Sequence, residues 1–255
     1  MHGLARQSPA MLELALPTTP ALALQSQGLA FLSPQRLHEA LGLPLHWSQS
    51  FTELLPAWDR LPPDAHLRDG GRYRHRRHSC YVQSLGSGTV ALQPHRAHWQ
   101  PTDYNALHGG YERWFDPIEA EMAQATAWLA LLQALGQLFA QVRPVTQWFI
   151  EAHPFRIDTA GGVGRPTPEG AHRDGVDFVV VMLIGRQGVK GGESRVFEAE
   201  GPQGLRFLMT EPLTTLLLDD RRVVHETTPI QPSGEGLGHR DTLVLTYRAG
   251  GFQAP

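Results

Sequence analysis

The chain has 255 residues, 41% of them hydrophobic, with 22 lysines and arginines against 25 aspartates and glutamates. This balance supplies a sizeable core and excludes a disordered chain, and a formal net charge of -3 argues against nucleic acid or an anionic membrane as a partner. Cys80 is the single cysteine, which excludes intramolecular disulfides, makes a cysteine-ligated structural zinc improbable and favours a reducing cytoplasm.

The N-terminus carries no targeting pattern. Its short apolar pieces are interrupted by Pro9, Pro17 and Pro20, and no run in the chain approaches 18 apolar residues. We therefore expect neither secretion nor a membrane span. The length suits a single domain over 1–255, in which about 1–60 form a helical extension.

Helical patterns precede residue 145. Short ones are predicted at 33–41, which opens on Ser-Pro, and around 51–58. The strongest covers 117–142, where Asp116 is the expected N-cap, Pro117 occupies the first helical position and apolar residues recur at helical spacing. That apolar stripe is typical of core packing and not of a cofactor site.

After residue 145 the pattern changes to short β-rich runs bounded by Gly, Pro and Asp. These runs cover 146–157, 177–184, 194–200, 205–210, 214–219 and 241–248, and two earlier ones cover 72–84 and 89–93. About eight short strands at this spacing predict a mainly β (α+β) sandwich or barrel of the jelly-roll kind, with the long helix packed on an outer sheet face.

Two His-x-Asp triplets precede predicted strands, His172-Arg173-Asp174 and His239-Arg240-Asp241. Side chains two residues apart in an extended segment share a face, so His172 and Asp174 can reach one metal ion. His225, at the end of a buried apolar run, is the expected third ligand, because a jelly roll returns beside its first strand over such a separation. Two imidazoles and one carboxylate that leave positions open are the arrangement of non-haem Fe(II) oxygenases.

The second triplet is then interpreted as part of a carboxylate-binding site and not as a metal site. Arg240 and Thr242 face the same side of the last predicted strand, and a guanidinium fork with an adjacent hydroxyl suits a carboxylate. We expect this pair to bind the distal carboxylate of 2-oxoglutarate, whose keto acid end binds the metal. The alternative makes His239 the third ligand and Arg248 the anchor; the Gly-rich loop around His239 favours His225.

Four ordered segments resemble a known family. They are PEGAHRDG at 168–175, GGES at 191–194, DDRRVVHETTPI at 219–230 and HRDT at 239–242. Together they resemble the bacterial 2-oxoglutarate/Fe(II) dioxygenase family that includes free L-isoleucine hydroxylases, over about 60–250. The resemblance implies a cupin-like double-stranded β-helix with helices on one face and a metal-bearing core at about 145–250. It also implies the same three metal ligands and the same 2-oxoglutarate anchor.

The resemblance extends to candidate substrate-binding residues. The family has an Arg-Tyr-Arg segment where this chain has Arg72-Tyr73-Arg74, and one face of it is expected to point an arginine at a substrate carboxylate. His153 also matches a family pattern, and Arg156 is a further candidate for the pocket wall. The plainer interpretations are a charged edge strand for the arginines and a buried core histidine for His153.

The leading hypothesis is a cytoplasmic Fe(II)- and 2-oxoglutarate-dependent dioxygenase that hydroxylates a small molecule. The resemblance implies dioxygen as a reactant, succinate and carbon dioxide as products, and a free L-amino acid as the favoured substrate, with a peptide side chain as the nearest alternative. A metal-binding jelly-roll sensor without turnover is a second hypothesis, since some relatives are associated with biofilm and stress phenotypes. Zinc-dependent hydrolysis is a third, and Arg240 argues against both.

Overall fold

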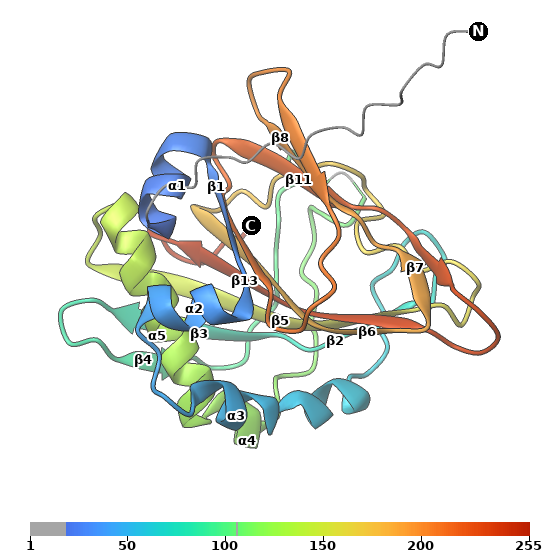
Figure 1. The fold of residues 1–255 in the computed structure, drawn as a ribbon, viewed down its shortest axis with the longest axis horizontal. Coiled ribbons are helices and arrows are strands. Elements are labelled where there is room, and N and C mark those ends of the chain that lie inside the picture. The colour runs from blue at the N-terminus through green and yellow to red at the C-terminus, as the bar shows by residue number, and fades with distance from the viewer. Residues whose placement is uncertain (1–18, 106) are drawn as a thin grey trace, which may run out of the picture.

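A large antiparallel sheet carries the fold of the computed structural model, which describes residues 19–105 and 107–255 (Figure 1). Its order is β1-β10-β6-β13-β5-β3-β4, and β2 also pairs with β5. The strands are β1 (Leu29–Leu32), β2 (Arg74–Arg76), β3 (Ser79–Ser84), β4 (Val90–Leu92), β5 (Gln147–Asp158), β6 (Phe178–Gln187), β10 (Thr215–Asp219) and β13 (His239–Arg248). The expectations for the first 18 residues lie outside the described residues, and the division at about residue 60 stays a prediction.

Two small sheets face the large one and complete the jelly roll. They are β11 (Val223–Thr227), β8 (Ser194–Glu198) and β9 (Gly204–Phe207), and β12 (Ile230–Pro232) with β7 (Val189–Gly191). Val196 and Val223 of the small sheet pack with inward-facing residues of β6 and β10 in one apolar cluster. Alternate residues of these strands thus fill the space between the layers.

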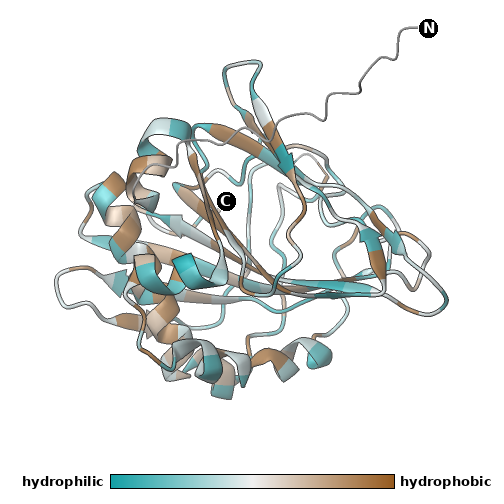
Figure 2. Ribbon diagram, viewed as in Figure 1, coloured by the Kyte–Doolittle hydropathy of each residue, from teal (hydrophilic) through white to brown (hydrophobic). Residues whose placement is uncertain are grey.

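The helices cover the outer face of the large sheet (Figure 1). They are α1 (Pro20–Gln27), α2 (Pro34–Leu41), α3 (Trp47–Thr52), the 3-10 turn η1 (Leu55–Arg60), α4 (Ala120–Ala123) and α5 (Thr126–Val142). Apolar residues gather on these helices and on the strands beneath them (Figure 2). None of the helices that the structure describes has the length and apolar character to cross a membrane.

One close contact explains a glycine inside α5. The indole of Trp148 donates to the carbonyl of Gly136 at 2.9 Å. A Cβ at that position would lie 1.8 Å from Oε1 of Gln83 and 3.0 Å from the Trp148 ring. The glycine therefore lets α5 pack closely against β5 and hold that strand in place. The inner face of β5 lines the cavity described below.

The mainly β jelly roll with helices on one face is confirmed, and the prediction of one helix from residue 117 is wrong at its start. The carbonyl of Asp116 accepts from the backbone of His78 at 3.0 Å, and the amide of Ile118 donates to Oγ of Ser79 at 3.0 Å. These bonds hold the segment extended beside β3, so the helix begins at Ala120. It is interrupted before α5. Short elements such as α1, β1, β7 and β12 were not predicted.

Candidate metal centre and the adjoining cavity

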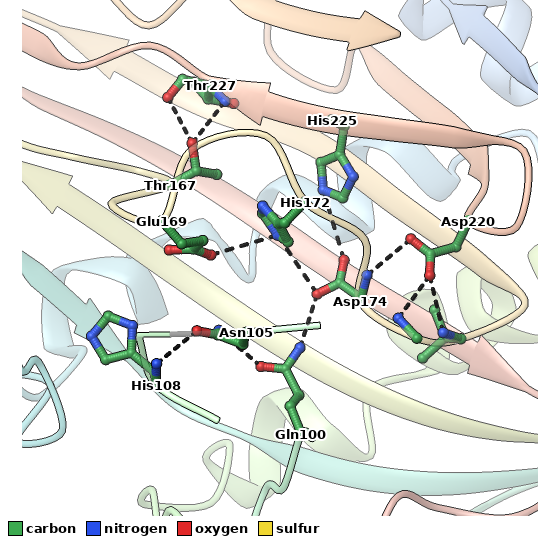
Figure 3. A network of polar contacts seen from close by, with 12 residues as sticks. Gln100, Asn105, His108, Thr167, Glu169, His172, Asp174, Asp220, His225 and Thr227 are labelled. Atoms are coloured by element: carbon green, nitrogen blue, oxygen red, sulfur yellow. Dashed lines mark hydrogen bonds and ion pairs between the residues drawn. The ribbon is translucent and has the colours of Figure 1, made fainter. Parts of the chain in front are cut away.

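His172, Asp174 and His225 converge between the layers, with one ligand atom from each within 4.8 Å of the others (Figure 3). His225 lies on β11, and His172 pairs with it through an isolated bridge with backbone hydrogen bonds of 3.1 and 2.9 Å. Asp174 Oδ1 lies 3.9 Å from Nε2 of His172, and its Oδ2 lies 3.7 Å from Nε2 of His225. These distances exceed a hydrogen bond and leave space for an ion between the three side chains.

The hydrogen bond of Nδ1 decides which ring nitrogen of His172 carries the proton. Nδ1 lies 2.9 Å from the carbonyl of Gly170, which can only accept, so Nδ1 carries the proton and Nε2 presents a lone pair toward Asp174. Burial opposes protonation of the ring, but Asp174 and Glu169 outweigh it and raise the pKa of His172. The environment thus favours a cation at Nε2, which is where a metal would bind.

His225 completes a donor set that fits iron. Burial, followed by the neighbouring His172, lowers the pKa of His225, so its ring is neutral and able to coordinate. Its Nδ1 has no hydrogen-bond partner in the described part of the chain. Two neutral imidazoles and one carboxylate on one side of an ion are what Fe(II) requires when it must keep positions open for substrates.

Gln100 holds the carboxylate of Asp174 in place. Its Nε2 donates to Oδ1 of Asp174 at 3.1 Å, and its Oε1 accepts from Asn105 at 3.2 Å (Figure 3). The same Oε1 accepts from Arg113 at 2.7 Å. A chain of hydrogen bonds therefore runs from a buried arginine to the candidate ligand. The sequence held no signal for Gln100, because it lies in a loop far from any motif.

Asp220 holds the backbone of the same segment. Its carboxylate accepts from the amides of Asp174, Gly175 and Val176 at 3.0, 2.8 and 3.0 Å (Figure 3). Burial, together with the charge of Asp174, raises the pKa of Asp220 to about 7. Asp220 belongs to the family-like segment 219–230, but nothing in the pattern separated its role from that of Asp219.

Arg240 and Thr242 face the same cavity from β13 and are only 2% and 4% exposed. Nε and Nη2 of Arg240 have no hydrogen-bond partner among the described residues. Burial lowers the pKa of Arg240 to about 10, so the guanidinium is still charged at neutral pH. A buried charge without a partner is costly, and a carboxylate bound here would remove that cost.

The alternative residues, His239 and Arg248, lie away from this cavity. Nε2 of His239 is 3.5 Å from Asp241 Oδ2, and Nη1 of Arg248 donates to the carbonyl of Gly251 at 2.8 Å. Neither lines the cavity wall. Strand alternation accounts for His239, which is one residue from Arg240 and therefore faces the other way. Arg248 has the same parity as Arg240, but it lies at the far end of β13.

Arginines form one wall of the cavity. Arg74 pairs with Asp64 at 2.7 Å. Arg76 lies between the rings of Phe115 and Phe155, at 3.9 and 4.3 Å from their centroids. Arg113 lines the same wall. Stacking on aromatic rings holds the Arg76 guanidinium without neutralising its charge.

The four predicted substrate-binding residues separate into two pairs. Arg74 and His153 line the cavity, and Arg72 and Arg156 do not. Arg156 faces the outer side of β5, where it donates to Asp241 at 2.7 and 2.8 Å and to Asp59 at 2.8 Å. Arg72 precedes β2 and lies outside the wall. The expectation for Arg72 and Arg156 therefore does not match their positions.

Comparison with solved structures gives several proteins that match most of the chain. A bsmA homolog from Methylobium petroleophilum PM1 is 58% identical, with a TM-score of 0.88 over 94% of this chain and 97% of that one. IDO from Bacillus thuringiensis is 18% identical, with a TM-score of 0.73 over 91% and 95%. The Fe(II)/α-ketoglutarate-dependent dioxygenase TqaL is 19% identical, with a TM-score of 0.66 over 89% and 85%, so these last two share the fold.

Comparison of sequences gives the family. No curated protein matches the chain. The profile of the 2OG-Fe dioxygenases, however, matches residues 55–246, which include the candidate triad and Arg240. Members of that family are oxidoreductases that require Fe(II) and 2-oxoglutarate, so a sensor without turnover is not favoured. The chain belongs to the 2OG-Fe dioxygenase family.

Proposed function

We propose that this enzyme hydroxylates a free L-amino acid, with His172, Asp174 and His225 as iron ligands and Arg240 with Thr242 as the anchor of 2-oxoglutarate. When bound, the iron supplies dioxygen activation and the oxidation of a C–H bond, coupled to decarboxylation of 2-oxoglutarate to succinate and carbon dioxide. The protein residues bind and orient the two organic substrates and keep water away from them.

The observation that carries the amino acid proposal is the uncompensated charge of Arg76 and Arg113. Both are buried in the cavity wall, at 4% and 2% exposure, and neither forms an ion pair with a described carboxylate. Nε of each has no partner within the described chain. Burial and neighbouring arginines lower the pKa of both groups, which reflects the cost of keeping these charges here. A substrate carboxylate would offset that cost.

Strand register supports separate sites for the two anions. Arg240 and Arg74 lie opposite each other across Ile157 of β5, and Thr242 and Arg76 lie opposite each other across Phe155. Two apolar side chains thus separate the proposed 2-oxoglutarate anchor from the arginine wall. Each carboxylate would then meet its own guanidinium, and the apolar pair would lie between them.

Glu169 supports a zwitterionic substrate. Its Oε1 lies 3.6 Å from Nε2 of His172, its side chain is 12% exposed, and its Oε2 is buried with no partner in the described residues (Figure 3). An α-ammonium group placed here would satisfy that oxygen, and the α-carboxylate would reach the arginine wall. A free amino acid offers both groups, whereas an internal peptide residue offers neither.

The test is a screen of the twenty L-amino acids for substrate-dependent succinate release with Fe(II), ascorbate and 2-oxoglutarate. We expect at least one to stimulate release and to gain one oxygen atom by mass spectrometry. Its analogues without the α-ammonium or without the α-carboxylate should be poor substrates. Stimulation by peptides and by no free amino acid would overturn the proposal and leave the family activity intact.

Two variants locate the groups that recognise the amino acid. Arg76→Lys and Glu169→Gln should each raise KM for the amino acid by about ten-fold to a hundred-fold, because each weakens a charge-assisted contact. The 2-oxoglutarate requirement should change little. Arg195→Lys, a partly exposed arginine on β8 that pairs with Glu193 and Glu226, is the matched control. An unchanged KM in both cavity variants would contradict this orientation.

A further inference from the structure

A second group of metal-binding side chains lies on the inner face of the large sheet, apart from the triad. His78 immediately precedes β3, Cys80 lies on β3, Glu151 lies on β5, and His98 comes from the segment between β4 and α4. These four side chains are here called the inner cluster. All four residues are buried, and each is at most 6% exposed. Polar groups of this kind are rarely buried together without a partner that uses them.

Three atoms of the inner cluster form a closed triangle. Nε2 of His78 lies 3.4 Å from Sγ of Cys80 and 3.4 Å from Oε1 of Glu151, and Sγ lies 3.8 Å from that Oε1. A tetrahedral zinc ion, with bonds of about 2.0–2.3 Å, holds nitrogen, oxygen and sulfur ligands about 3.3–3.6 Å apart. The triangle therefore has nearly the dimensions of one face of a zinc site.

His98 is the candidate for the fourth donor, through its contact with Glu151. Its Nδ1 lies 3.0 Å from Oε2 of Glu151, and a ligand atom of His98 lies within 4.8 Å of those of His78 and Glu151. Glu151 thus stands between two imidazoles, and the register of β3 and β5 sets Cys80 directly opposite it. Four donors of nitrogen, oxygen and sulfur type are a set that suits zinc.

A ligand atom of His153 also lies within 4.8 Å of those of His78, His98 and Glu151, but two contacts argue against His153 as a ligand. Arg76 donates to its Nδ1 at 2.6 Å, so the ring proton is on Nε2. The ring also stacks on His78, with centroids 4.7 Å apart and planes 14° apart. Because ring nitrogens coordinate within the ring plane, two parallel stacked imidazoles do not aim at one ion.

The protonation of the cluster also suits a cation. Burial lowers the pKa of His78 and brings that of His98 to about 4, so both rings are neutral at pH 7. Burial opposes ionisation of Glu151, but His98 and His78 outweigh it and keep its pKa below the usual range. Burial raises the pKa of the Cys80 thiol, so without a cation the sulfur keeps its proton.

Two cavities reach the cluster. His98 lines the cavity of the triad, and His78 and Cys80 line a second one together with Gln93, His95 and Arg96. The donors are therefore buried, but they are not enclosed on all sides by packed side chains. An ion can approach them without unfolding of the sheet.

Contrary to the expectation from the single cysteine, we propose that the inner cluster is a second metal site, which binds Zn²⁺ through His78, Cys80, His98 and Glu151. On binding, the Cys80 thiol releases its proton to solvent and the thiolate joins the Glu151 carboxylate, so two negative charges balance the divalent ion. All four positions are then filled by protein atoms. Such a closed site stabilises the junction of β3 and β5 beneath the cavity and takes no part in oxidation.

Co²⁺ is the probe for this site, because thiolate ligation of Co²⁺ gives a near-ultraviolet charge-transfer absorption. Cys80 is the single cysteine, so any such band must come from it. The metal-free full chain should bind about two Co²⁺ and show the band. Asp174→Ala, which disables the triad, should bind about one and keep the band. Cys80→Ser should lose the band and keep binding at the triad, with circular dichroism as the check of folding.

Absence of a thiolate band from both the wild type and Asp174→Ala, with saturating Co²⁺, would overturn the proposal. This result does not depend on the folding of Cys80→Ser. Zn²⁺ gives a second readout, since it should raise the unfolding temperature of Asp174→Ala and leave that of Asp174→Ala with Cys80→Ser unchanged. An equal rise in both would also contradict the proposal. Neither measurement depends on the substrate proposed above.

Discussion

The triad and the inner cluster use the same residue types in opposite ways. The triad side chains are 11–16% exposed, and the facing atoms of its ligands are 3.7 and 3.9 Å apart with no direct hydrogen bond between them. In the inner cluster, Glu151 already meets His98 at 3.0 Å, and the three side chains of His78, His98 and Glu151 are 1–7% exposed. The first arrangement would leave positions open on a bound ion for substrates, and the second would enclose an ion with protein atoms.

The triad and the inner cluster also differ in the parts of the chain that hold them in place. The triad lies on a bridge and a short strand, and Gln100 and Asp220 reach in from loops to hold it. In the inner cluster, Cys80 and Glu151 lie opposite each other in the register of β3 and β5, His78 directly precedes β3, and His98 comes from the segment between β4 and α4. The triad thus depends on hydrogen bonds from outside its own elements, whereas the inner cluster combines strand pairing at Cys80 and Glu151 with one loop residue, His98.

The largest expected effect is that of Asp174→Ala. Loss of the carboxylate removes one of three proposed ligands, so 2-oxoglutarate turnover should fall by more than about a hundred-fold, beyond the usual effect of a supporting residue. The fold should remain, since the backbone bonds to Asp220 do not involve this side chain. Succinate release measures turnover, and circular dichroism checks the fold. Turnover near the wild-type level would remove Asp174 from the ligand set.

Arg240→Lys should have the next largest effect. An ammonium group keeps the charge but not the planar fork, so 2-oxoglutarate affinity should fall by about ten-fold to a hundred-fold while Co²⁺ still binds at the triad. Thr242→Val should weaken affinity in the same direction by less. The measurement is titration of the anaerobic Fe(II) protein with 2-oxoglutarate. A loss confined to Arg248→Lys would instead transfer the anchor to Arg248.

Local patterns were sufficient for the fold and for part of the site. Alternation and turn residues gave most long strands, and the spacing of His172 and Asp174 followed from extended geometry, because side chains two apart share a face. The same rule could have placed Arg156 correctly. It is three residues from His153, so it must face the opposite side of β5, where it meets Asp241 and Asp59.

The rest depended on contacts between distant segments. Cys80 and Glu151 meet because β3 pairs with β5 in one register, and His98 joins them from the segment between β4 and α4. No local pattern specifies which strand pairs with which or which loop folds over them. The same limit applies to Asp220, whose role arises only when the turn between β10 and β11 lies beside residues 174–176. Hydrogen bonds from the Asp116 segment to β3 likewise override a good helix start.

Asp220→Asn tests whether the triad depends on hydrogen bonds from residues outside its own elements. The amide retains one acceptor oxygen where the carboxylate offers two, so at least one of the three backbone amides at 174–176 loses its partner. Metal affinity at the triad should fall by about ten-fold, in the range expected for a supporting group. Asp158→Asn, a partly exposed carboxylate that pairs with His75, is the matched control. Equal affinities in the two variants would assign Asp220 a purely structural role.

The smallest expected effect is a change in the free energy of unfolding of the metal-free protein, and it arises from the inner cluster. Burial lowers the pKa of His98 to about 4, whereas an unfolded histidine titrates near 6.5, so between these values the unfolded chain binds the extra proton. The free energy of unfolding should therefore fall as the pH is lowered from about 6.5 toward 4, by up to about 1.4 kcal/mol per pH unit for each such proton.

His98→Gln, whose amide can still donate to Glu151, should reduce that slope by about one proton, and exposed His46→Gln should leave it unchanged. Urea unfolding of the metal-free protein at several pH values measures the slope. Identical slopes in the wild type and His98→Gln would mean that the ring takes up its proton over the same pH range in the folded and unfolded chain. That result would weaken the case for His98 as a neutral donor in a closed site.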